Sequence, residues 1–280
     1  ISPRGALNAW SLEQKRLKKS LALTLGWRSL LESATYLHAL NHQEAQQLTR
    51  LRLSSPVFTA PNGIFPSLDR PPSGAFRSCH EELTSRRFVL FLSRLHVKKG
   101  LDILVKAFSE VATEIPDVDL VVAGPDEGAE APLRNDIAHF NLEGRVHLVG
   151  PLYGPDKQAA LRDASVFCLP SRDEGFSMAV LEAMGAGLPA VISERCNFPE
   201  AKTRNAAVIC SLEPSALAAA LKTLLLDEDA RIRIAENGQH LVEAEYTWNV
   251  IAAQTIRGYL EHRQVTHSPR PHPPYPDNSP

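Results

Sequence analysis

Hydrophobic positions in the second half of the chain change repeatedly between two periods. Short runs of almost purely apolar residues alternate with longer stretches in which apolar side chains recur every three or four residues. Continuous apolar runs are typical of strands buried on both faces, and the longer period is typical of amphipathic helices. Strands that alternate with helices predict an α/β fold with a parallel sheet covered on both faces. The predicted strands cover residues 88–93, 118–123, 146–149, 166–169, 190–193 and 207–210.

The helix after the first of these strands has the clearest pattern. Its apolar side chains form one stripe, and Pro116 lies just beyond its end, where a helix is expected to stop. The stripe consists of Leu101, Leu104, Val105, Phe108, Val111 and Ala112. Further helices are predicted at residues 213–226, 229–245 and 248–264.

The first part of the chain contains fewer elements. The pattern predicts a helix over 16–32, a strand over 35–40, a helix over 43–51 capped by Asn41, and a strand over 56–60. Residues 67–78 are rich in Pro, Ser and Gly and predict a linker at a domain boundary. We therefore divide the chain into a first domain, a second domain, a closing helix and a disordered tail, at residues 1–64, 65–247, 248–264 and 265–280.

Composition places the chain among ordinary globular proteins, because 44% of its 280 residues are hydrophobic and 22% are charged. A formal charge of −2 gives no basic footprint for nucleic acid, and the basic stretch at 15–19 is typical of a solvated helix face. No apolar run reaches the roughly 20 residues of a membrane span, and no signal peptide opens the chain. The four cysteines lack paired spacing, which favours a reducing cytoplasm. Since the earliest methionine is Met178, we expect that the numbering begins inside a longer reading frame.

The segment with the most specific chemistry runs from Glu174 to Glu182. Ser177 stands where an N-cap belongs, just before the apolar residues of a short helix, so the first N–H groups of that helix favour an anion. Carboxylates accept hydrogen bonds from sugar hydroxyls. A single glutamate is more often a solvated surface residue, but two glutamates around such a helix start indicate a bound nucleotide sugar. The phosphates would lie at the helix end, the sugar near Glu174 and the ribose near Glu182.

Two cations belong to the same predicted crevice. Residues 171–177 follow the strand at 166–169, and Arg94 and Lys99 follow the strand at 88–93. Ligands of open parallel sheets bind at the carboxyl ends of the strands. We therefore expect Arg94 and Lys99 to neutralise a diphosphate beside the two acids.

Four segments in this order and spacing carry a family resemblance. They are residues 91–100, 121–125 and 146–150, and the pair Glu174 and Glu182 with seven residues between them. The chain resembles the retaining GT-B glycosyltransferases of family 4, also called group 1, densely over residues 87–248 and more loosely at 2–5 and 61–63. The resemblance implies two Rossmann-like domains, an acceptor-binding domain followed by a donor-binding domain. In this chain it implies a complete donor domain with a parallel sheet and only a partial N-terminal acceptor domain.

The resemblance also implies roles for individual residues. Arg94 and Lys99 would bind the donor diphosphate, Glu174 would hold hydroxyls of the transferred sugar, and Glu182 would hold the ribose. We count Glu174, Arg94 and Lys99 as the catalytic residues. The segment after residue 149 would pass near the base, and the helix over 248–264 would cross back to the acceptor half. The sugar and phosphate site would be completed by backbone groups of Gly175, Phe176 and Ser177.

The implied reaction is transfer of a sugar from a nucleoside diphosphate to a glycan or lipid-linked acceptor, with retention of configuration, in glycan or cell-surface polysaccharide synthesis. It implies no metal and no cofactor besides the donor, and no nucleic acid partner. His38 and His42 lie four residues apart without a third ligand nearby, which favours a structural role over a metal site. The expected location is the cytoplasm, with peripheral association at the inner face of the membrane as an alternative.

Three other functions remain open on the sequence alone. A nicotinamide enzyme would use the glycines at 185 and 187, but these close a helix and precede a strand, whereas a dinucleotide fingerprint follows a strand and opens a helix. A GT-B nucleotide-sugar epimerase would share the fold, and a donor-binding module without catalysis would share the site. For a transferase, we expect Glu174→Ala and Lys99→Ala to abolish activity while the fold stays intact, because both side chains should be exposed in the cleft.

Overall fold

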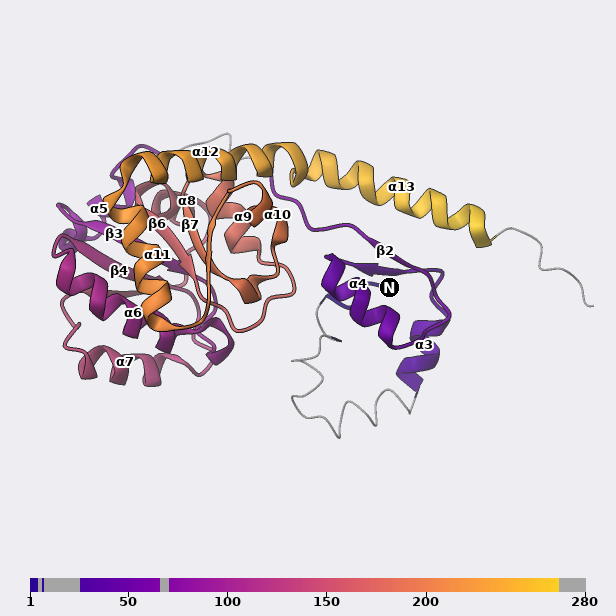
Figure 1. The fold of residues 1–280 in the computed structure, drawn as a ribbon, viewed down its shortest axis with the longest axis horizontal. Coiled ribbons are helices and arrows are strands. Elements are labelled where there is room, and N and C mark those ends of the chain that lie inside the picture. Colours follow the sequence, from indigo (N-terminus) through magenta and orange to yellow (C-terminus); the bar gives the residue numbers. More distant parts are fainter. Residues whose placement is uncertain (5–6, 8–25, 66–70, 267–280) are drawn as a thin grey trace, which may run out of the picture. The chain divides into compact units, whose positions relative to one another are not determined.

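The computed structural model describes residues 1–4, 7, 26–65 and 71–266 (Figure 1). The chain forms two compact units. One unit contains the described residues up to Ala60 together with those from Ala252 onward, and the other runs from Pro61 to Ile251. Helix α13 (Trp248–Thr266) begins in the second unit and continues into the first.

A six-stranded parallel sheet forms the centre of the larger unit. Its order is β5-β4-β3-β6-β7-β8. The prediction of six strands in a parallel sheet is confirmed, with differences of one residue at a few strand ends. The strands are β3 (Arg87–Leu92), β4 (Val118–Ala123), β5 (Val146–Gly150), β6 (Val166–Leu169), β7 (Ala190–Ser193) and β8 (Val208–Cys210).

Helices cover both faces of this sheet (Figure 1). On one face α6 packs against α7 and α11, and elsewhere α9 packs against α12 and α5 packs against α8. The helices are α5 (Ala75–Ser78), α6 (Leu101–Glu114), α7 (Glu130–His139), α8 (Gly154–Asp163), α9 (Met178–Gly185), α10 (Pro199–Thr203), α11 (Pro214–Leu226) and α12 (Glu228–Glu245). Short 3-10 turns are η2 (Glu81–Leu83), η3 (Val97–Lys99) and η4 (Glu194–Cys196).

The hydrophobic core lies between the sheet and these helices. All six residues of β4 and all four of β6 and β7 are buried, as their apolar runs predict. Phe88, Phe91, Phe108 and Phe167 are among the largest side chains that are fully buried. Complete burial of one such side chain contributes about 1.5–3 kcal/mol. The core therefore holds the strands rigidly and fixes the positions where the loops leave the sheet.

The predicted linker at 67–78 is wrong at its C-terminal end, since residues 75–78 form α5 and Phe76 is buried in the core. Both carboxylate oxygens of Asp163 accept backbone N–H groups at the start of this helix, from Gly74 at 2.6 Å and from Phe76 at 2.9 Å. This cap comes from a distant part of the chain, so local composition could not predict it. Residues 66–70, around the start of the predicted linker, lie outside the described residues.

The smaller unit contains α3 (Arg28–Glu32), β1 (Leu37–Ala39), α4 (His42–Arg50) and β2 (Val57–Thr59), and its two strands are parallel. The side chain of Asn41 accepts the N–H of Glu44 at 2.8 Å, which confirms the predicted cap. The ring of Tyr259 stacks on Tyr36 with a centroid distance of 4.8 Å, so this part of α13 packs within the smaller unit. Most of the predicted helix at 16–32 and the tail at 267–280 lie outside the described residues.

Candidate functional site

The strand order creates a crevice between β3 and β6. These strands are neighbours, but the chain goes from β3 outward to β4 and from β6 outward to β7, on opposite sides. After these two strands the chain therefore continues toward opposite sides of the sheet, and ligands of such sheets bind at the carboxyl edge beside this point. A cavity of about 530 Å³ lies at this edge. Of the predicted site residues, the cavity is lined by Arg94, Lys99, Glu174, Phe176, Ser177 and Glu182.

Glu174 and Lys99 form a buried ion pair in the lining of this cavity. Their side chains are 9% and 10% exposed, and Lys99 Nζ lies 2.5 Å from Glu174 Oε1. The hydroxyl of Ser171 donates a second hydrogen bond to the same oxygen at 2.6 Å. The expectation that both charges are exposed is therefore wrong. The loops from β3 and β6 come close enough to cover the pair, which spacing along the chain does not reveal.

The backbone of Glu174 is held by a third loop that the sequence did not indicate. Its N–H donates to the carbonyl of Arg195 at 3.0 Å, and the side-chain amide of Asn197 donates to the carbonyl of Glu174 at 2.7 Å. Asn197 has a φ of +53°, a left-handed conformation that Asn tolerates better than most residues. Burial, and then the charge of Glu174, raise the pKa of the neighbouring Cys196 thiol to about 12.

The loops after β3 and β6 are also joined directly. The N–H of Arg172 donates to the carbonyl of Lys98 at 2.8 Å, and the Arg172 guanidinium forms a bidentate pair with the carboxylate of Asp102 at 2.6 and 2.9 Å. Gly100 has a φ of +71°, and a Cβ atom there would lie 2.1 Å from the carbonyl oxygen of Pro170. Only glycine fits at this position. These contacts fix Lys99 beside Glu174.

Helix α9 begins and ends as the sequence predicts. Ser177 is extended, and its hydroxyl accepts the N–H of Val180 at 3.4 Å, which confirms the N-cap. At the other end Gly187 has a φ of +74°, and the N–H of Leu188 donates to the carbonyl of Ala183 at 2.9 Å. These are the features of a helix C-cap. The glycines therefore end a helix and do not open one, which removes the basis for a nicotinamide site.

Glu182 meets a cation that the sequence interpretation did not include. Lys157, in the first half of α8, places its Nζ 2.8 Å from Glu182 Oε1 and also lines the cavity. Both side chains are about one quarter exposed. The only indication before the structure came from the family resemblance, which implied that the segment after residue 149 passes near the base. Lys157 adds a third cation to the site.

Arg94 lies at the rim. Its side chain is 58% exposed and pairs with the carboxylate of Glu127, with contacts of 2.6 and 2.8 Å. The hydrogen bond from Arg94 lowers the pKa of Glu127. The structure thus brings Arg94, Lys99 and both predicted acids to one cavity, while Gly175 is not among the residues that line it.

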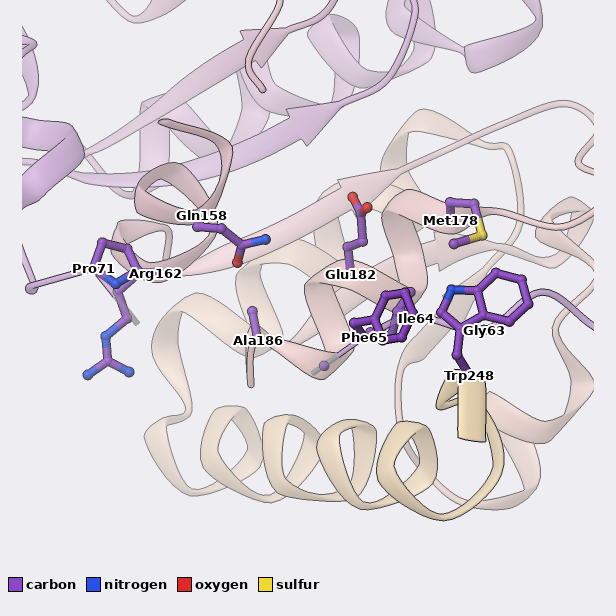
Figure 2. A pocket seen from close by; sticks show the side chains of 11 residues that line it. Gly63, Ile64, Phe65, Pro71, Gln158, Arg162, Met178, Glu182, Ala186 and Trp248 are labelled. Atoms are coloured by element: carbon purple, nitrogen blue, oxygen red, sulfur yellow. The ribbon is translucent and has the colours of Figure 1, made fainter. Parts of the chain in front are cut away.

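A second, smaller pocket adjoins the first and shares Glu182 and Met178 with it. Its volume is about 290 Å³, and the rings of Phe65 and Trp248 lie 6.4 Å apart in its wall. Figure 2 shows the Trp248 ring beneath Met178, whereas the guanidinium of Arg162 points away from Glu182. No sequence pattern indicates this pocket, because its lining residues come from segments far apart in the chain.

Comparison with known proteins identifies the family. The profile described as glycosyl transferases group 1 matches residues 75–241. The chain belongs to this family. One subunit of the human phosphatidylinositol N-acetylglucosaminyltransferase is 27% identical over 205 residues, which is 72% of this chain and 40% of that protein. The phosphatidyl-myo-inositol mannosyltransferase of Mycobacterium leprae is 32% identical over 212 residues, or 74% of this chain and 54% of that protein. The chain thus spans about half the length of these curated relatives.

Solved structures agree on the fold. Sucrose-phosphate synthase from Thermosynechococcus elongatus has a TM-score of 0.71 and 24% identity, covering 86% of this chain and 61% of that chain. Anabaena Alr3699/HepE, in complex with UDP and glucose, has a TM-score of 0.78 and 19% identity, covering 93% and 70%. These neighbours show that the α/β fold is of the GT-B type, as the resemblance implied.

Neither a membrane-spanning helix nor a metal cluster is found among the described residues. None of the helices in this part of the chain combines the length and apolar character needed to cross a membrane. Within the same residues, no three His, Cys, Asp or Glu side chains are grouped in a way that could hold a metal ion.

Proposed function

We propose that this chain binds a nucleoside diphosphate sugar in the cavity at the carboxyl edge of the sheet and transfers the sugar with retention of configuration. The observation that carries the proposal is the convergence of Glu174, Lys99, Glu182 and the N-terminus of α9 on one cavity of about 530 Å³. A cavity of this size is typical of small-molecule sites. Its polar groups match the parts of such a donor.

The diphosphate would lie at the start of α9. The first backbone N–H groups of a helix have no partner within the helix and carry partial positive charge, so they favour an anion. Arg94 is exposed and held by a single carboxylate, so it can exchange Glu127 for a phosphate oxygen at little cost. Lys157 reaches the same cavity from α8. The proposal assigns stabilisation of the leaving diphosphate to these groups and to Lys99, without a metal ion.

The transferred sugar would lie against Glu174. Lys99 and Ser171 both donate to Oε1, so Oε2 is the oxygen that we assign to the sugar hydroxyls. Glu182, farther along the helix, would accept the hydroxyls of the ribose. The position of each acid is then set by a separate cation, Lys99 for Glu174 and Lys157 for Glu182.

In the proposed reaction the bond between the anomeric carbon and the diphosphate oxygen breaks, and the electron pair stays on the diphosphate. The acceptor oxygen bonds to the anomeric carbon on the same face, and the proton of the acceptor hydroxyl passes to a diphosphate oxygen. Two relatives are named for phosphatidylinositol substrates, and a fold neighbour was solved with UDP and glucose. These names support a nucleotide sugar as donor and a lipid-linked or glycan acceptor. The location that we propose is the cytoplasm, at the inner face of the membrane.

Isothermal titration with UDP-glucose, GDP-mannose and UDP-N-acetylglucosamine tests the donor assignment. We expect saturable binding of at least one donor, weakened by Glu182→Gln and Arg94→Met and unchanged by Arg233→Met, an exposed arginine outside the cavity. The absence of binding to a panel of all common nucleotide sugars would overturn it.

Analysis of the reaction products distinguishes a retaining transferase from an epimerase and from a binding module without catalysis. A retaining transferase yields a glycoside with the donor's anomeric configuration, which NMR spectroscopy reports. An epimerase would change the sugar without an acceptor. A binding module would leave the donor intact with every acceptor.

A further inference from the structure

Another polar cavity lies at the opposite edge of the same sheet, and its volume is about 360 Å³. Arg87 is the first residue of β3, Ser165 directly precedes β6 and Pro189 directly precedes β7, and all three line it. The proposed donor cavity begins at the other end of β3, roughly 16 Å away at about 3.3 Å per residue. The two cavities share no lining residue, although Arg162 also lines the pocket of about 290 Å³ that adjoins the donor cavity. The donor assignment therefore does not account for this cavity.

Four arginines from four different elements line it. They are Arg77 of α5, Arg87 of β3, Arg162 of α8 and Arg231 of α12. One carboxylate, that of Asp163, is also in the lining. Its two oxygens accept backbone N–H groups at the start of α5, so they are engaged by the backbone and not by the arginines.

Two of the arginines have carboxylate partners outside the lining, and two do not. Arg87 pairs with Asp117 at 2.8 Å, and Arg231 pairs with Glu228 at 3.2 Å. The Nη2 of Arg77 donates to the backbone carbonyl of Asp163 at 2.7 Å, while its buried Nε has no hydrogen-bond partner in the described part of the chain.

Arg162 is the most available of the four. Arg162 is exposed, and its guanidinium has no ion pair or hydrogen bond with residues 1–4, 7, 26–65 and 71–266. Its guanidinium points away from Glu182 (Figure 2). The guanidinium of Arg162 and the Nε of Arg77 thus have N–H groups without a partner among the residues that the structure describes, in a cavity whose lining contains one carboxylate. Such donors can bind an oxyanion that carries more than one negative charge.

We propose that this arginine cavity binds a phosphate group, that is, a phosphomonoester or inorganic phosphate. Guanidinium groups present several N–H donors in a plane, which suits phosphate oxygens, and charge-assisted bonds of this kind are roughly twice as strong as neutral ones. The hydroxyl of Ser165 provides an additional donor. The phosphate group belongs either to a soluble compound or to a lipid headgroup. The site is independent of the proposed donor cavity.

Calorimetric titration of the full chain with inorganic phosphate, at constant ionic strength, tests this site. We expect saturable binding that Arg162→Met weakens by roughly tenfold, because one charge-assisted contact is lost. Arg233→Met removes the same charge from an exposed position on α12 outside the cavity, and it should leave binding unchanged. Arg94→Met tests whether the titrated phosphate binds in the donor cavity instead. We expect that it leaves the measured phosphate affinity unchanged.

Three results would overturn the assignment: unchanged binding in Arg162→Met, an equal loss in Arg233→Met, or transfer of the loss to Arg94→Met. The first excludes the site, the second indicates diffuse charge, and the third places the phosphate in the donor cavity. Failure of nucleotide sugars to bind would leave the phosphate result unaffected, so the two proposals fail separately.

Flotation with phosphatidylcholine vesicles, with and without phosphatidic acid, identifies the source of the phosphate group. Flotation that depends on phosphatidic acid and is lost in Arg162→Met supports a lipid headgroup. Phosphate binding without such flotation supports a soluble phosphate compound.

Discussion

Glu174, on a loop, and Glu182, on a helix, both present a carboxylate to the cavity, but their side chains are held in different ways. Glu174 is buried, is bound by Lys99 and Ser171, and has its backbone fixed by Arg195 and Asn197. Glu182 is partly exposed, and a single lysine pairs with it. The first acid is therefore positioned before any ligand arrives, whereas the second can rearrange around one.

The difference has energetic consequences. Removing one partner of a buried ion pair leaves an uncompensated charge and costs about 3–5 kcal/mol, whereas an exposed pair contributes about 0.2–1 kcal/mol. Substitutions at Glu174 thus change stability and binding together. Substitutions at Glu182 change binding almost alone, which makes Glu182 the cleaner position for testing the donor site.

The largest effect is expected for Glu174→Ala. This change leaves the ammonium of Lys99 buried without its partner, and we expect the free energy of unfolding to fall by about 3–5 kcal/mol. Urea denaturation measures this value. The isosteric Glu174→Gln keeps a hydrogen-bond acceptor and should cost less. A change below about 1 kcal/mol in Glu174→Ala would show that the pair is solvated and that the contrast with Glu182 is wrong.

A double substitution separates stability from binding. We expect Lys99→Met with Glu174→Leu to recover most of the stability lost in Glu174→Ala, because apolar replacement of a whole buried pair is often close to neutral. Donor binding, measured by calorimetry, should remain absent. If the double variant is as unstable as Glu174→Ala, the loss comes from the packing of the loop and not from the unpaired charge.

A smaller effect on stability is expected for Glu182→Gln. The Lys157 pair is partly exposed, so the free energy of unfolding should change by less than about 1 kcal/mol. Binding should lose part of its preference for ribose over 2′-deoxyribose. We expect the unmodified chain to bind UDP roughly tenfold more tightly than 2′-deoxy-UDP, and this ratio to fall in Glu182→Gln, because a neutral amide oxygen is a weaker acceptor than a carboxylate. An unchanged ratio would remove Glu182 from the ribose site.

The smallest effect concerns Cys196, which lies beside Glu174. Burial raises the pKa of its thiol from 9.0 to about 12, so the folded chain holds a proton that the unfolded chain releases between these values. The stability due to the neutral thiol is therefore complete below pH 9 and declines as the pH rises toward 12. Cys196→Ala should show a shallower decline in thermal unfolding across this range. An equal decline in both proteins would assign the effect to other groups.

Iodoacetamide labelling checks the same environment near neutral pH. Cys79 is exposed and should react first, whereas Cys196 and Cys168 are buried and should react only on unfolding. Mass spectrometry of the labelled peptides distinguishes these sites. Early labelling of Cys196 would show that the loop behind Glu174 opens readily, which is incompatible with a rigid position for this acid.

Local sequence patterns were enough to predict the sheet, its parallel type and the start and end of α9. Each of these features has a local cause: apolar runs for buried strands, a hydroxyl at Ser177 for the N-cap, and a left-handed glycine at Gly187 for the C-cap. The same patterns place Arg94 and Glu174 at one edge, because parallel strands put the loops that follow them on the same side.

Which charges meet, and which are buried, depends on packing in three dimensions. The pairing of Lys99 with Glu174, of Lys157 with Glu182 and of Arg94 with Glu127 follows from where separate loops and helices pack. The four arginines of the arginine cavity come from segments far apart in the chain. Whether two charges pair, and whether they are buried, depends on separations of a few ångströms in space. The number of residues between them along the chain does not determine such separations.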